Sequence, residues 1–199
     1  MNKIQHILIV LFCLFSFSGN GQESNKSTVQ FEQLVLEEVN FLRSNPQEYA
    51  EKQLKTEFNE GEDNGAYDFL KKLMPVNKLV LNDKLNRLAN NYARVIAFKK
   101  TLSHNFNGNP MKRANKAGYF GMIGENLAAG SEEKYNALEN PQTAAIEFVK
   151  MLVIDKGVKD LGHRKILNEP RFKEMGVGFY RDPKDKLKNY FVQEFGSQQ

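Results

Sequence analysis

The fold is decided by the stretch Gly162-His163-Arg164-Lys165-Ile166-Leu167-Asn168 and by the segment Gly176-Val177-Gly178-Phe179-Tyr180 that follows it. This stretch places a histidine between a glycine and two cations, and the segment after it is strand-like but interrupted by two glycines. Earlier in the chain lie His104 and the triplet Gly124-Glu125-Asn126. We expect the fold to bring His104, Glu125 and His163 together around one cleft.

The first 21 residues have the pattern of a secretory signal. A short cationic start, Met1-Asn2-Lys3, precedes an apolar run over residues 7–17, and small residues follow at 18–21. Such a run is typical of a signal peptide and is too short for a transmembrane helix. We therefore expect cleavage after Gly21, a flexible segment at 22–29, one domain over 30–196, and a secreted or periplasmic protein.

The single cysteine, Cys13, lies inside the apolar run of the predicted signal. The bulky residues at 10–12 before it are unlike those that precede a lipidated cysteine, so release is favoured over lipid anchoring. The processed chain would contain no thiol. This excludes a cysteine nucleophile, cysteine-ligated zinc and disulfides.

The charge pattern excludes a nucleic-acid groove. The net charge is +4, and its basic pairs are scattered along the chain as Lys71-Lys72, Lys99-Lys100, Lys112-Arg113 and Arg164-Lys165. No patch combines dense Lys and Arg with interleaved aromatic residues. A solvated cationic surface is expected, and weak attraction to anionic envelope surfaces is the alternative. The acidic segment 57–65 does not have the spacing of an EF-hand and is predicted to be a solvated loop.

Hydrophobic periodicity predicts helices around residues 29–42, 46–56, 66–74, 82–100 and 141–152, with a helical turn after Pro110. Asn45, Asn82 and Asn140 are expected to cap the helices that follow them. An extended segment is predicted at 125–130 and a hairpin at 174–195, with its turn at 182–185. This order of elements indicates an α+β fold in which helices pack on a small antiparallel sheet.

His104, His163 and Glu125 form a chemically reasonable set for a divalent cation such as zinc. The alternatives from the residues alone stay open. Each histidine could be structural, and Glu125 could tie strand to loop by accepting hydrogen bonds. Ser103 next to His104 suggests a nucleophile and base, but neighbours on an extended segment point to opposite faces. Arg164 and Lys165 could bind an anion, or Arg164 could pair with an acid.

Several motifs in order resemble the CAP superfamily of cysteine-rich secretory, antigen 5 and pathogenesis-related 1 proteins, in its bacterial SCP-like secreted form. The resemblance covers nearly all of residues 30–196. Its motifs are Val39-Asn40-Phe41-Leu42-Arg43, Ser103-His104, Arg113, Gly118-Tyr119, residues 124–130, residues 162–167, Gly176-Val177-Gly178 and residues 191–196. The resemblance implies an α-β-α sandwich, with a small antiparallel sheet between helical layers and a large central cleft.

In that family two histidines and two acidic residues line the cleft. The resemblance carries over His104 and His163 as metal ligands and Glu125 as the acid that would catalyse. The fourth position departs from the pattern, because Met151 stands where many relatives have a glutamate. Asp155 resembles an acidic residue of a bacterial subgroup. Asp155, Ser103 and Asn126 are therefore predicted to line the cleft.

Three functions follow from this interpretation. The first is a monomeric secreted binding module for an envelope, lipid-like or protein ligand, with Zn²⁺ or another divalent cation organising the cleft. It agrees with the sterol and lipid binding described for the family. The alternative is a metal-assisted, peptidase-like hydrolase that uses His104, His163 and Glu125. The third is an envelope-interaction protein without turnover.

Overall fold

The computed structural model describes residues 20–198, and the side chains from Val29 onward. The helices are α1 (Asn20–Ser44), α2 (Pro46–Gln53), α3 (Lys55–Asn59), α4 (Ala66–Lys72), α5 (Asp83–Lys99), α6 (Pro110–Lys116), α7 (Pro141–Ile154) and α8 (Gly162–Leu167), with a 3-10 turn η1 (Glu133–Tyr135). The strands are β1 (Val80–Leu81), β2 (Gly121–Gly130), β3 (Glu174–Arg181) and β4 (Asn189–Gln198).

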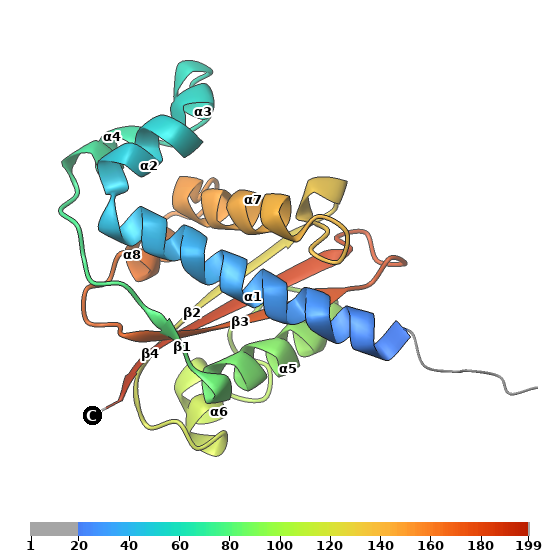
Figure 1. The fold of residues 1–199 in the computed structure, drawn as a ribbon. Coiled ribbons are helices and arrows are strands. Elements are labelled where there is room, and N and C mark those ends of the chain that lie inside the picture. Colours follow the sequence, from blue (N-terminus) through green and yellow to red (C-terminus); the bar gives the residue numbers. More distant parts are fainter. Residues whose placement is uncertain (1–19, 199) are drawn as a thin grey trace, which may run out of the picture.

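The four strands form one mixed sheet in the order β1-β3-β4-β2. β4 pairs antiparallel with β3 on one side and with β2 on the other, and β1 runs parallel to β3. Helices α1 and α7 cover one face of the sheet and α5 and α6 cover the other (Figure 1). The predicted α+β fold, with a sheet between helical layers, is therefore confirmed, and β1 adds one parallel pair to an otherwise antiparallel sheet.

The apolar stripe of α5 packs directly on the backbone of β3. The seven residues predicted to form this stripe are buried: Leu85, Leu88, Ala89, Tyr92, Ala93, Ile96 and Ala97. A Cβ atom at Gly176 would lie 2.1 Å from the carbonyl carbon of Leu85, and one at Gly178 would lie 2.2 Å from that of Ala89. The two glycines of the β3 motif therefore set how closely helix and sheet approach.

Arg43 links α1 to two distant segments. Its buried guanidinium donates to the carbonyl oxygens of Asn77 (2.9 Å), Leu167 (2.7 Å) and Glu169 (3.1 Å). Burial lowers the Arg43 pKa to about 10. These bonds explain why an arginine follows an apolar helix face. It satisfies carbonyls that neither a helix nor a strand would pair.

Some local expectations differ from the structure. α3 occupies the start of the predicted acidic loop, and α8 forms in a stretch that the periodicity did not predict as a helix. Asn82 caps α5 by accepting from the amide of Lys84 at 2.9 Å, whereas Asn45 and Asn140 make no cap with their side chains. Asn45 instead donates its amide to Ser44 Oγ. Local preference predicted these caps, and at Asn45 the neighbouring hydroxyl group competes for the side chain.

The predicted signal falls mainly on residues 1–19, which lie outside the described part of the chain. α1 begins at Asn20, ahead of the predicted domain boundary at 30, and that boundary stays a prediction. Within residues 20–198, no helix combines the length and the apolar character needed to cross a bilayer.

We expect Gly178→Ala to lower the free energy of unfolding by about 1–3 kcal/mol, because its Cβ would overlap the backbone of α5. The measurement is chemical denaturation followed by circular dichroism. Gly162→Ala is the matched control, since no atom lies within 4 Å of its new Cβ. Equal stability of the two variants would contradict the close packing of α5 on β3.

Candidate functional site

The two histidines are held by two different buried carboxylates. His104 Nδ1 lies 2.7 Å from Oε1 of Glu125, which projects from β2. His163 Nδ1 lies 2.8 Å from Oδ1 of Asp155, the residue that ends α7. The His104 side chain is 48% exposed and that of His163 is 19% exposed. Since Nδ1 is engaged in both rings, Nε2 is the nitrogen that each presents to other groups.

Glu125 also binds Arg113, which fixes the loop that carries His104. The Arg113 guanidinium pairs with Glu125 Oε2 and donates to the carbonyl oxygens of His104 (2.7 Å), Phe106 (3.3 Å) and Gly108. It also lies over the Tyr92 ring, 3.5 Å from the centroid. Arg113 thereby holds the loop between α5 and α6 against β2. Glu125 thus ties strand to loop by accepting hydrogen bonds, and its donors are side chains and not backbone amides.

Asp155 is positioned by the turn between α7 and α8. It adopts a left-handed conformation, with φ of 56°, and its Oδ2 accepts from the amide of Arg164 at 3.2 Å. The buried Arg164 guanidinium donates to the carbonyl oxygens of Val153, Ile154 and Asn64. Arg164 therefore stabilises this turn and is not free to bind an anion. Asp155 holds Nδ1 of His163 in the same way that Glu125 holds Nδ1 of His104.

Sequence reasoning missed Glu194, which lies opposite Glu125 in the β2–β4 register. Glu194 is fully buried, and neither of its carboxyl oxygens has a hydrogen-bond partner among the described residues. Burial raises the Glu194 pKa well above its ordinary value, and the adjacent Glu125 carboxylate raises it further. The available signal was the polar pair Gln193-Glu194 inside an otherwise apolar closing strand.

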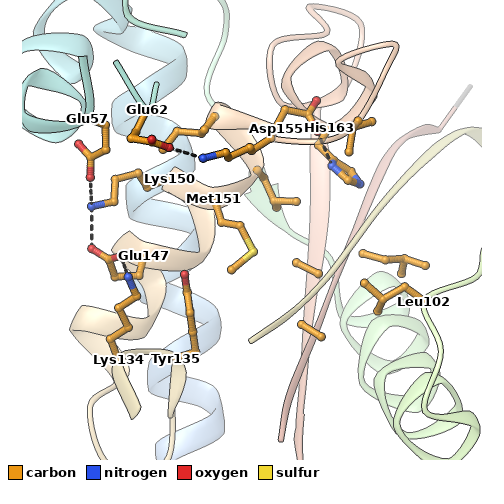
Figure 2. Close-up of a pocket in the computed structure, with 17 residues that line it drawn as sticks. Glu57, Glu62, Leu102, Lys134, Tyr135, Glu147, Lys150, Met151, Asp155 and His163 are labelled. Carbon is orange, nitrogen blue, oxygen red and sulfur yellow. Dashed lines mark hydrogen bonds and ion pairs between the residues drawn. The ribbon is translucent and has the colours of Figure 1, made fainter. Parts of the chain in front are cut away.

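A pocket of about 390 Å³ lies between α7 and β2, with His163 and Asp155 at one end (Figure 2). At its other end Lys150 bridges Glu57 (2.7 Å) and Glu147 (2.8 Å), and Lys134 lies 3.3 Å from Glu147. The middle is apolar, and the residues that line it are Leu102, Leu127, Ala128, Ala129, Met151, Leu152, Ile154 and Val158.

The residues predicted to line the cleft differ in position. Asp155 lines the pocket, whereas Ser103 and Asn126 are not among its lining residues. The Ser103 carbonyl accepts from Tyr92, and the buried Asn126 amide donates to Gln193 Oε1 at 3.2 Å. His104 does not line this pocket either, but Leu102 on the same loop does.

The side chains do not form a complete zinc site. In the described part of the chain, no three His, Cys, Asp or Glu side chains are grouped so that they could hold a metal ion. Catalytic zinc sites use three protein ligands and an open position. Glu125 and Asp155 each occupy a histidine Nδ1, the place of an outer carboxylate that orients a ligand. The divalent cation therefore stays a prediction, and we derive no reaction step through it.

We expect Glu194→Gln to stabilise the protein increasingly as the pH rises. A raised pKa means that the folded state binds the Glu194 proton more tightly than the unfolded state. The free energy of unfolding therefore falls as the pH rises above about 4.5. The neutral amide does not titrate, so the variant should gain up to about 1.4 kcal/mol for each pH unit over which Glu194 stays protonated.

The measurement is urea denaturation of both proteins at a series of pH values from about 5 to about 7.5. Glu139→Gln, at an exposed position, is the control and should show no such trend. A constant difference between the Glu194→Gln variant and wild type across the series would refute the raised pKa.

The comparison with curated protein sequences gives no match. Two solved structures are similar. An extracellular protein of Bacillus anthracis that contains a SCP domain has a TM-score of 0.47 and 18% identity, over 62% of this chain and 35% of that one. An outer surface protein of Borrelia burgdorferi has a TM-score of 0.45 and 23% identity, over 72% of this chain and 92% of that one. This chain thus spans about a third of the first protein.

Among known families, residues 36–195 match CAP, the cysteine-rich secretory protein family. The match includes His104, Glu125, Asp155 and His163 and extends from α1 to β4. The chain therefore belongs to the CAP family.

Proposed function

We propose that this chain is an exported binding module whose pocket between α7 and β2 takes an amphipathic, lipid-like ligand. The observation that carries the proposal is the shape and chemistry of that pocket, about 390 Å³ with an apolar middle and polar ends. Export is supported by the cationic start and apolar run of residues 1–21.

The apolar middle suits the hydrocarbon body of a ligand. Its walls come from Leu127 and Ala129 on β2, Met151 on α7, and Leu102 on the loop across the pocket (Figure 2). Pockets of this size that bind small molecules are mainly apolar, with a few placed polar groups. Burial of apolar ligand surface would supply most of the binding free energy.

The two ends have different roles. At one end, Lys150 pairs with Glu147 and Glu57, and Glu147 also pairs with Lys134. The charges at this end therefore already neutralise one another. At the other end, Asp155 orients the His163 ring and leaves Nε2 available. We therefore assign the ligand's polar group to the His163 end.

Three features support binding over turnover. Among the residues that the structure describes, no serine, threonine or cysteine lines the pocket. Both oxygens of Glu125, the residue expected to act as general base, are engaged by His104 and Arg113. His104 and His163 are each paired with a different carboxylate. The hydrolase alternative has no comparable observation in its favour.

We expect the protein to bind myristate, and Met151→Trp to weaken that binding by at least about tenfold by filling the pocket. Isothermal titration calorimetry with the mature chain measures the affinity. Met74→Trp is the matched control, because Met74 is 75% exposed and lies outside the pocket. Failure of wild type to bind myristate, or equal loss in both variants, would overturn the lipid-like assignment.

A metal that organises the cleft makes a separate prediction. If His104 and His163 together bind zinc through Nε2, calorimetric titration should show one site that is lost in both His104→Ala and His163→Ala. Zinc binding that is unchanged in His163→Ala would exclude this pair as ligands. Hydrolysis of a peptide or ester panel that depends on His163 would instead favour the hydrolase.

A further inference from the structure

The chain's net positive charge is concentrated in the helical layer formed by α5 and α6. Residues 84–124, which include nearly all of α5 and the whole of α6, hold eight of the 28 Lys and Arg residues. None of the 24 Asp and Glu residues lies in this stretch. The absence of acids marks this segment more than the density of its cations does.

The fold gathers these cations on one side of the molecule. α5 and α6 pack against each other and cover the face of the sheet opposite α1 and α7 (Figure 1). We define the basic face by six exposed residues of this layer: Arg87, Arg94, Lys99, Lys100, Lys112 and Lys116. Lys100 pairs with Asp185, and the other five make no ion pair within the described residues. The basic face is therefore largely uncompensated.

Large apolar side chains stand exposed among these cations. Phe98 is 82% exposed, Phe120 is 66% exposed and Met111 is 42% exposed. Phe98 comes one helical turn after Arg94, on the side of α5 away from its buried stripe. Exposed apolar side chains cost free energy in water, so their presence within a basic surface points to a partner that is both anionic and apolar.

We propose that the basic face docks on an anionic phospholipid bilayer. Lysine and arginine are attracted to anionic headgroups, and aromatic and aliphatic side chains insert at the boundary with the acyl chains. A polyanion such as nucleic acid would use the cations but would leave Phe98 and Met111 in water. This assignment does not depend on the ligand of the pocket, because none of the six residues of the basic face lines that pocket.

The test is co-sedimentation of the mature chain with vesicles of phosphatidylglycerol and phosphatidylcholine in equal parts. Vesicles of phosphatidylcholine alone are the reference. The protein should sediment with the anionic vesicles only, and raising the salt concentration should release it because the attraction is screened. No binding to the anionic vesicles, or equal binding to both kinds, would overturn the proposal.

Charge reversal locates the face. Arg94→Glu combined with Lys99→Glu should reduce partitioning by at least about tenfold, since each cation near an anionic surface contributes severalfold. The matched control is Lys72→Glu with Lys78→Glu, which changes net charge equally at exposed positions outside the basic face. None of the four side chains makes a hydrogen bond or ion pair within the described residues. Equal loss in both double variants would mean that net charge alone drives binding.

The apolar contribution separates a bilayer from a polyanion. Phe98→Ala should lower partitioning by about fivefold through loss of the inserted ring, whereas Met74→Ala, at an equally exposed site elsewhere, should not. Heparin binding should be unaffected by Phe98→Ala. Vesicle binding that is insensitive to Phe98→Ala would show a purely electrostatic polyanion surface and overturn the bilayer assignment.

Discussion

The cleft depends on the burial of the Glu125 carboxylate. A buried anion is stable only where donors and an opposite charge surround it, and here Arg113 and His104 supply both. Because the same guanidinium holds three carbonyl oxygens of the loop between α5 and α6, the ion pair also sets that loop's position. The positions of Leu102 at the pocket wall and of His104 beside Glu125 are consequences of this one interaction.

A second carboxylate repeats the arrangement at the end of the pocket where His163 lies. Asp155 accepts from the Arg164 amide and orients His163, while the Arg164 side chain holds the turn that carries both. Each imidazole thus has one nitrogen fixed and one presented. The site has the rigidity expected of a recognition surface, because its groups are positioned before any ligand arrives.

The sheet separates two surfaces of different character. On the α7 side, the charges at the end of the pocket are paired with one another and enclose an apolar space. On the α5–α6 side, the six cations of the basic face are exposed, and only Lys100 has an ion pair among the described residues. This segregation is possible because Gly176 and Gly178 let α5 pack closely through one apolar stripe. The exposed side of that helix is then free to carry charge.

The sequence by itself determined most of the elements and the family. The apolar stripe of α5, the closing hairpin and the ordered motifs are local patterns, so they can be recognised from the sequence alone. It also contained the absence of acids between residues 84 and 124. Only the tertiary structure decided which carboxylate holds which histidine, that Glu194 lies opposite Glu125, and that Ser103 and Asn126 lie outside the pocket. These pairings join residues far apart in the chain, so they depend on strand register and loop path. A shift of one residue in that register would move each side chain to the opposite face of the sheet.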